Sequence, residues 1–83
     1  MSQHSVLLLN DDDTPMEFVV DVLQRFFGME RQSAVEIMLR VHNVGASQCG
    51  SFDLDTAKAK VADVIEFARQ NHHPLQCAMM KNK

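Results

Sequence analysis

The chain has 83 residues, of which 46% are hydrophobic and 23% are charged, and its formal net charge at pH 7 is −3. This composition predicts one small globular domain and excludes both a disordered tail and a protein with two hydrophobic cores. Lysine and arginine are scattered, so no basic stripe indicates nucleic-acid binding, and apolar runs such as Val6–Leu9 are far too short to span a membrane.

The first predicted element is a buried strand that ends in a polar loop. Val6–Leu9 is wholly apolar and stops at Asn10, which three aspartates follow. A helix start comes next, because Thr14 can act as its N-cap, Pro15 suits the first helical position and Glu17 completes a capping box. The sequence therefore predicts that the acidic loop leads directly into a helix.

Two amphipathic helices follow this start. Apolar residues of the first recur at helical spacing, at Phe18, Val19, Val22, Leu23, Phe26 and Phe27. Gly28 is expected to end this helix, because glycine readily adopts the left-handed conformation that terminates helices. A second helix is predicted from about Arg31 to Asn43, with Gly45 as its stop. The apolar face of the second helix consists of Ala34, Ile37, Met38 and Val41.

The second half of the chain predicts two strands on either side of a third helix. Ala46–Phe52 is typical of a strand, and Asp53 can cap the helix that follows it. Apolar residues recur at helical spacing at Ala57, Val61, Val64, Ile65 and Ala68. Pro74 pushes His73 out of helical geometry, so the helix should end before them, and a last strand should run from Leu75 to Met80.

These elements predict an α/β (α+β) fold with a single small domain in the order β-α-α-β-α-β. So short a chain cannot cover both faces of a sheet, so we expect three helices packed on one face of a three-stranded antiparallel sheet. Residues 1–5 are expected to form a short N-terminal tail and residues 6–83 the core domain. Cys49 and Cys77 lack metal-site spacing and no export signal precedes the first strand, so we expect reduced thiols buried in strands and a cytoplasmic protein.

The sequence argues against an enzyme. Aligned on Thr14, the phosphotransferase motif Asp-x-Asp-x-Thr requires an aspartate nucleophile where this chain has Asn10, which cannot form an acyl phosphate. A calcium loop that starts at Asp11 fails because no glycine occupies its turn position and no glutamate closes it. No Gly-rich phosphate loop and no nucleophile elbow occurs. We therefore expect no catalytic residue, no metal and no cofactor.

The acidic run and His42 form the candidate site. A solvated turn is an ordinary interpretation of such aspartates, since adjacent carboxylates repel one another unless they are screened. Two features favour binding: Asn10 and Asp11 leave the strand on opposite faces, and His42 lies one helical turn after Met38. A lone histidine at such an edge more often has a purely structural role. The residues by themselves leave both interpretations open.

Several stretches of the chain together form a more specific pattern. They are Leu7-Leu8-Leu9-Asn10-Asp11-Asp12, Thr14-Pro15-Met16-Glu17-Phe18-Val19, Met38-Leu39-Arg40-Val41-His42, Cys49-Gly50, Ala57, Lys60-Val61 and His73-Pro74-Leu75-Gln76-Cys77. In collinear order from about Val6 to Lys81, this pattern resembles the ClpS-type N-degron (N-end rule) adaptor of the Clp AAA+ protease. The resemblance implies a bacterial, non-enzymatic adaptor. It would bind proteins that begin with Leu, Phe, Tyr or Trp and deliver them to a Clp unfoldase paired with a peptidase.

The resemblance also implies roles for individual residues. Asn10, Asp11 and His42 would bind the α-amino group, with Asp12 close by. The pocket for the first side chain would be lined by Thr14, Met16, Val19, Met38, Val41 and Leu75. Asp55 and Lys60 fall where the family contacts the N-terminal domain of the unfoldase. The implied partners are N-degron substrates and this unfoldase, with no nucleic acid, no membrane and a monomeric adaptor.

The chemistry of these residue types suits that task. A free α-amino group has a reference pKa of about 7.7–8.0 and is therefore largely an ammonium with three N–H donors. Asn10 offers a carbonyl oxygen, Asp11 a carboxylate and His42 a ring nitrogen, which is one acceptor for each donor. Charge-assisted hydrogen bonds contribute about 1.5–3 kcal/mol each, and burial of a Leu- or Phe-sized side chain contributes about as much. Tight binding should therefore require both the free α-amino group and the bulky first side chain.

Some positions depart from the family pattern. Asp13 stands where an aromatic residue is usual, and its carboxylate raises the negative potential at the pocket mouth. Lys58 and Ala59 replace a Glu-Thr pair near the docking face, and Met80 replaces an acidic residue. Family members carry a flexible N-terminal extension, so a chain with only Met1–Ser5 before the strand is expected to bind substrates but deliver them poorly. The alternatives are an unfoldase-docking modulator with a degenerate pocket and, more distantly, a metal-binding or phosphoryl-accepting domain.

Overall fold

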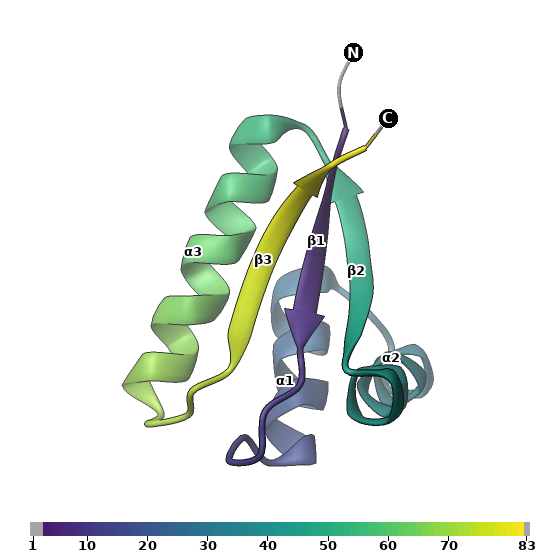
Figure 1. Cartoon of the computed structure of the whole chain (residues 1–83), viewed down its shortest axis with the longest axis vertical. Coiled ribbons are helices and arrows are strands. Elements are labelled where there is room, and N and C mark those ends of the chain that lie inside the picture. Colours follow the sequence, from purple (N-terminus) through teal and green to yellow (C-terminus); the bar gives the residue numbers. More distant parts are fainter. Residues whose placement is uncertain (1–2, 83) are drawn as a thin grey trace.

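Within residues 3–82, which the computed structural model describes, the elements follow one another in the predicted order β-α-α-β-α-β (Figure 1). They are β1 (His4–Leu9), α1 (Met16–Phe27), α2 (Arg31–Val44), β2 (Ala46–Phe52), α3 (Leu54–Gln70) and β3 (Gln76–Lys81). The expected fold class, a single small α/β (α+β) domain, is confirmed by this arrangement.

The first strand begins earlier than the apolar run suggested. β1 includes His4 and Ser5, which we assigned to the N-terminal tail, and both pair with β2 and β3. Residues 1 and 2 of that tail, and residue 83, lie outside the described part of the chain. The polar strand start is explained by its position at the sheet end, where the Ser5 hydroxyl donates to the side chain of Asn82 at 2.6 Å.

The start of α1 also differs from the prediction. The helix begins after Pro15, and no side chain caps it. The prediction that Thr14 caps this helix is wrong, because its hydroxyl donates to the carboxylate of Asp11. The predicted capping box is wrong as well, since the Glu17 carboxylate accepts a hydrogen bond from Arg31 at 2.9 Å. Thr14 therefore belongs to the loop before the helix.

β1 is the central strand of the sheet, which has the order β2-β1-β3. It pairs antiparallel with both neighbours, and Leu8 stands opposite Ser47 of β2 and Cys77 of β3. The register with β2 shifts between Val6 and Leu7, so that β2 carries an extra residue at this point. The expected three-stranded antiparallel sheet is therefore confirmed.

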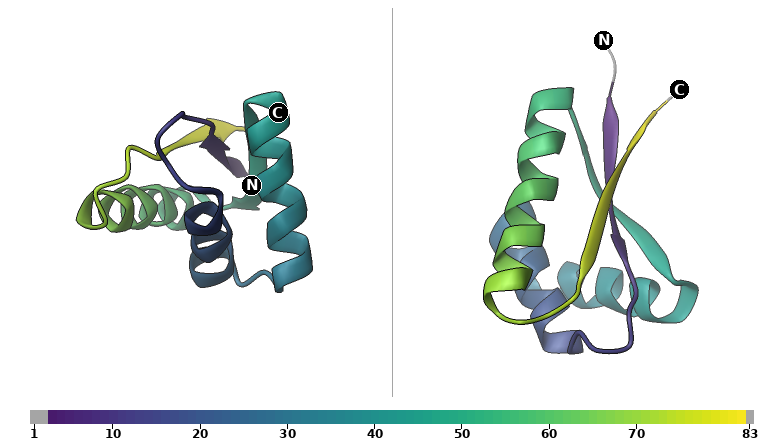
Figure 2. Two further views of the ribbon diagram at one scale, coloured as in Figure 1. Left: turned by 90° about the horizontal axis from the view of Figure 1, so that it is seen from below. Right: turned by 60° about the vertical axis from the view of Figure 1, so that its left-hand side comes forward.

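The three helices cover one face of this sheet, as predicted (Figure 2). Val6 and Leu8 point into the helical layer and are fully buried, whereas Leu7 and Leu9 alternate to the other face and are only partly buried. Met80 of β3 is exposed. Within residues 3–82, no helix is both long enough and apolar enough to cross a membrane.

Three residues that were predicted to begin or end a helix do so in the structure. Gly28 ends α1 with φ of 64°, and Gly45 ends α2 with φ of 105°, both in the left-handed region that favours glycine. Asp53 caps α3, because its carboxylate accepts a hydrogen bond from the Thr56 N–H at 2.8 Å. The Gly45 turn leads straight into β2 and brings the end of α2 to the end of β1.

Both cysteines are free and buried in strands, as expected. Burial raises the pKa of the Cys49 thiol to about 12, and the neighbouring Cys77 adds to this increase. Burial alone raises the pKa of the Cys77 thiol to about 11. Each side chain therefore stays a protonated thiol at neutral pH and packs as a small apolar group.

Candidate functional site

The loop between β1 and α1 is attached to the end of α2. Asn10 follows the last residue of β1, and its backbone N–H donates to the carbonyl oxygen of Gly45 at 2.9 Å. Gly45 is the C-cap of α2, and His42 lies in the last turn of that helix. This backbone hydrogen bond therefore places Asn10 and His42 on neighbouring segments, although 32 positions separate them in the sequence.

Asp11 organises the rest of this loop. Its Oδ1 accepts hydrogen bonds from the backbone N–H groups of Asp13 at 2.9 Å and Thr14 at 2.8 Å. Its Oδ2 accepts a hydrogen bond from the Thr14 hydroxyl at 2.7 Å. A carboxylate has about four lone-pair sites, so these three bonds leave acceptor capacity on Oδ2. Asp12 and Asp13 are exposed, and their carboxylates lie outside this network.

The surroundings of Asp11 keep its carboxyl group ionised. Partial burial by itself would raise the pKa of Asp11. The hydrogen bonds from Thr14 and Asp13, together with the nearby His73 imidazole, outweigh burial and hold the pKa of Asp11 below its usual value. Asp11 is therefore a fixed negative charge at neutral pH.

A cavity of about 310 Å³ lies between this loop, the start of α1 and the second half of α2. It is lined by Asn10, Asp11, Asp12, Thr14, Pro15, Met16, Val19, Met38, Val41 and His42. The polar lining comes from the loop and from His42, and the apolar lining comes from the two helices and Pro15. The cavity thus combines hydrogen-bond acceptors and negative charge with an apolar wall.

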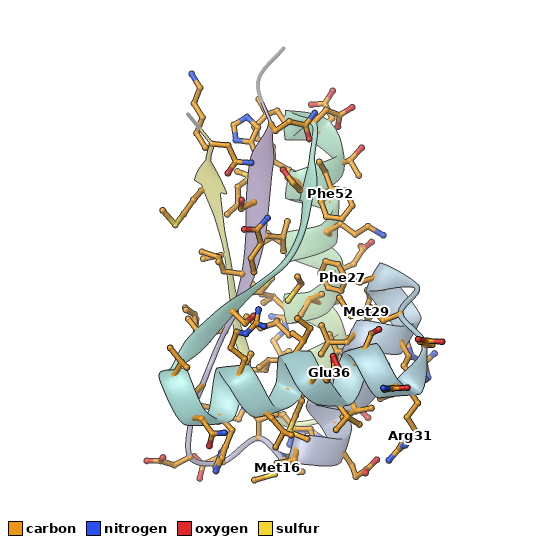
Figure 3. All side chains as sticks on the ribbon, turned by 90° about the vertical axis from the view of Figure 1, so that its right-hand side faces the viewer. Met16, Phe27, Met29, Arg31, Glu36 and Phe52 are labelled. Atoms are coloured by element: carbon orange, nitrogen blue, oxygen red, sulfur yellow. The ribbon has the colours of Figure 1, made fainter. Side chains whose placement is uncertain are left out.

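The apolar wall has a rigid part and an exposed part. Val19, Met38 and Val41 are buried and belong to the hydrophobic core. Met16 is 45% exposed, so its flexible side chain can adapt to whatever enters the cavity. Figure 3 shows Met16 at the start of α1, below α2. His42 is exposed and therefore open to a ligand at the cavity mouth.

The structure places Leu75 differently from the other predicted wall residues. Leu75 is buried and lines a second, larger cavity of about 470 Å³, together with Ile65, Arg69, His72, His73, Pro74 and Gln76. This second cavity contains no carboxylate, and the two cavities share no lining residue. His73 lines the second cavity and also acts electrostatically on Asp11 of the first, and its ring contacts Phe18 of α1 edge-on, with ring centroids 4.5 Å apart.

Asp55 and Lys60 lie on α3, away from the cavity. Asp55 is exposed in the first turn of the helix. Lys60 is half-buried, and its Nζ donates to the carbonyl oxygen of Phe26 and lies 5.8 and 5.7 Å from the ring centroids of Phe27 and Phe52. Phe27 and Phe52 lie near one another on the side drawn in Figure 3. The ammonium of Lys60 is thus held over an aromatic surface.

Some residues near the site were not predicted from the sequence. His73 belonged to the family pattern but was given no role at the site, yet it lowers the pKa of Asp11. Thr14 was expected to form part of the pocket wall and to cap α1, whereas its hydroxyl bonds to Asp11. The spacing Asp-x-x-Thr was the available signal, because an aspartate often accepts bonds from groups two and three residues later.

The described residues form no site of metal-binding type. Among residues 3–82, no group of three or more His, Cys, Asp or Glu side chains is arranged so that it could hold a metal ion. Three hydrogen bonds within its own loop use most of the acceptor capacity of Asp11, and Asp12 and Asp13 are exposed. The chemistry of the cavity is that of hydrogen-bond acceptors next to an apolar wall.

Comparison with known proteins points to one family. Residues 1–78 match the family model described as ATP-dependent Clp protease adaptor protein ClpS. The ATP-dependent Clp protease adapter protein ClpS of Brucella canis is 60% identical over 80 residues, which cover 96% of this chain and 69% of that protein. ClpS 1 of Rhizobium meliloti is 56% identical over 80 residues, which cover 96% and 68%. The solved structure of Agrobacterium tumefaciens ClpS2 bound to L-phenylalaninamide superposes with a TM-score of 0.95 at 28% identity, covering 98% of both chains.

Proposed function

Because the chain belongs to the ClpS family of ATP-dependent Clp protease adaptors, we propose that it binds proteins through their N-terminal residue and delivers them to a Clp AAA+ unfoldase. The preferred first residues are Leu, Phe, Tyr and Trp. Recognition uses two features together, a free α-amino group and a bulky hydrophobic side chain. In this role the chain is an adaptor and carries out no catalysis. We place it in the cytoplasm as a monomer.

The observation that carries this proposal is the composition of the smaller cavity. Its lining combines the acceptors of Asn10, Asp11 and His42 with an apolar wall that includes Val19 and Met38. An N-terminal residue has two parts that complement these, an ammonium group and a hydrophobic side chain joined at one carbon. The solved ClpS2 structure, whose ligand is L-phenylalaninamide, supports the same assignment, since that molecule has a free amino group beside a benzyl side chain.

In the proposed complex, the three ammonium donors bind to three different acceptors. Asn10 and His42 provide two of them, and the unused acceptor capacity of Asp11 Oδ2 provides the third. Asp12 stays exposed and adds negative charge nearby. Asp13, which is also exposed, makes the loop more acidic than in the family pattern, so we expect salt to weaken binding more than it would with an aromatic residue there.

The test is a titration with two fluorescently labelled peptides that differ only in their first residue, Phe or Ala. Replacing the benzyl group by a methyl removes about 1.5–3 kcal/mol of apolar burial, so the Ala peptide should bind roughly 10- to 150-fold more weakly. Fluorescence anisotropy measures both dissociation constants. Equal affinities would contradict the proposal that the cavity recognises a bulky hydrophobic first side chain.

We further expect discrimination against β-branched first residues. Met16 stands at the rim of the cavity, close to where the first side chain would enter, and a branch at the β-carbon would crowd it. Overpacking costs about 1–3 kcal/mol, so a peptide that begins with Ile should bind at least about fivefold more weakly than one that begins with Leu. The same titration in a Met16→Ala variant provides the control, because the gap between Ile and Leu should narrow there. A parent protein that binds both peptides equally would refute this role of Met16.

The second part of the proposal, delivery of substrates to the unfoldase, concerns α3. Asp55 offers an exposed carboxylate, and Lys60 offers an ammonium held over Phe27 and Phe52, so a partner of complementary charge can contact both. Lys58, also exposed on α3, reverses a charge next to this surface relative to the family pattern. The alternative is a modulator that docks on the unfoldase with a degenerate pocket. Such a protein would bind the unfoldase's N-terminal domain but show no affinity for the Phe peptide.

A further inference from the structure

The side chain of Thr14 carries a methyl and a hydroxyl, which could serve the cavity in different ways. The residue lines the cavity, and its hydroxyl donates to Oδ2 of Asp11 at 2.7 Å. We infer that the Thr14 hydroxyl is a positioning group, which fixes the Asp11 carboxylate so that Oδ2 keeps a free lone pair facing an incoming ammonium. This inference rests on the proposed function, since it assigns Thr14 a role in binding the α-amino group.

The hydrogen bonds around Asp11 explain how the hydroxyl acts. The two backbone N–H groups of Asp13 and Thr14 bond only to Oδ1. They attach one oxygen to the loop but leave the rotation of the carboxylate plane about the Cβ–Cγ bond weakly restrained. The Thr14 hydroxyl bonds the other oxygen and so restrains this rotation. With both oxygens held, the unused lone pair of Oδ2 has a defined direction before a ligand arrives.

The charges around Asp11 are the reason why such a restraint matters. Asp12 and Asp13 are adjacent in the same loop, and their like charges favour rotation of the Asp11 carboxylate towards solvent. From other elements, His42 of α2 lines the same cavity, and His73 after α3 lowers the pKa of Asp11 through its charge. Glu17 of α1 is paired with Arg31. The hydrogen bond from the Thr14 hydroxyl to Asp11 thus opposes the repulsion between the carboxylates of the loop.

The two possible roles of Thr14 predict opposite results for a matched pair of variants. Thr14→Val keeps the shape and the methyl group and removes only the hydroxyl. Thr14→Ser keeps the hydroxyl and removes only the methyl. If Thr14 acts merely as apolar wall, the serine variant should bind more weakly and the valine variant should match the parent. If the hydroxyl positions Asp11, the valine variant should bind more weakly and the serine variant should stay close to the parent.

Isothermal titration with L-phenylalaninamide at pH 7 measures this difference. We expect about a tenfold weaker affinity for Thr14→Val, equivalent to about 1.4 kcal/mol, and a change of less than about twofold for Thr14→Ser. Urea unfolding of both variants checks that the fold is retained. Unchanged affinity of Thr14→Val overturns the inference alone. Absence of any binding by the parent overturns the proposed function and the inference with it.

A double-mutant cycle shows whether Thr14 acts through Asp11. In an Asp11→Asn background, Thr14→Val should weaken binding by less than about twofold, because the carboxylate that the hydroxyl positions is gone. An undiminished tenfold effect in that background would overturn the inference. A measurement without ligand provides a separate check. Carboxyl carbon NMR titration should find a higher pKa for Asp11 in Thr14→Val than in the parent, and an equal pKa would also count against positioning.

Discussion

A peptide that begins with phenylalanine should bind at least about a hundredfold more tightly than the same peptide with an acetylated α-amino group. Acetylation removes the positive charge and two of the three N–H donors that Asn10, Asp11 and His42 are proposed to bind. Charge-assisted hydrogen bonds contribute about 1.5–3 kcal/mol each, so loss of two such bonds accounts for a hundredfold or more. The acetyl group also has to fit into a cavity of only about 310 Å³.

The matched control for this experiment is acetylation elsewhere in the same peptide. A peptide with a lysine several residues from its start can be acetylated on that side chain, with the same added mass and the same loss of charge. This second peptide should bind as tightly as the unmodified one. If both acetylated peptides lose affinity equally, net charge explains binding and the ammonium site is refuted.

Leu8→Ala should reduce the free energy of unfolding by about 3–5 kcal/mol. Leu8 is fully buried near the C-terminal end of the middle strand, between β2 and β3, and faces the helical layer. Truncation removes its packing and leaves a cavity that the two flanking strands prevent from closing. Small domains have total stabilities of about 5–15 kcal/mol, so this single change should remove a large part of the total. Urea unfolding followed by circular dichroism measures the loss.

Leu39→Ala provides the comparison for this experiment. Leu39 has the same side chain but is 43% exposed on α2, so its truncation should reduce the free energy of unfolding by less than about 1 kcal/mol. Similar losses for the two variants would show that burial of Leu8 does not hold the sheet and the helices together.

Much of the fold could be predicted because its local signals agree with one another. Gly28 and Gly45 were expected to end helices, and both adopt the left-handed conformation there. The apolar run in β1 located the central strand, although its polar start at His4 and Ser5 was missed. Those two residues are in the sheet because of pairing with β2 and β3, and pairing partners distant in sequence leave no mark on local composition.

The candidate site was less predictable than the fold. The residues expected to bind the α-amino group, Asn10, Asp11, Asp12 and His42, do line one cavity together. Their meeting depends on the long-range hydrogen bond between Asn10 and Gly45, which periodicity cannot reveal. Thr14 was expected to cap the helix because its spacing from Glu17 fits a capping box, but its hydroxyl donates to the Asp11 carboxylate instead. Leu75 is buried beside a different cavity, so its place as a wall residue of the binding cavity stays a prediction.

The hydrogen bond from the Asn10 N–H to the Gly45 carbonyl oxygen has a thermodynamic consequence. It connects the loop that carries Asn10 to the helix that carries His42 before any ligand is present, so the backbone positions of these two residues are preorganised. Ordering of protein segments on association is a major entropic penalty, and this bond should reduce it for the proposed complex. We therefore expect ordering of the flexible peptide to contribute much of the conformational entropy lost on binding. A substrate with a short, rigid N-terminal segment should accordingly bind with a more favourable entropy than one with a flexible segment and the same first residue.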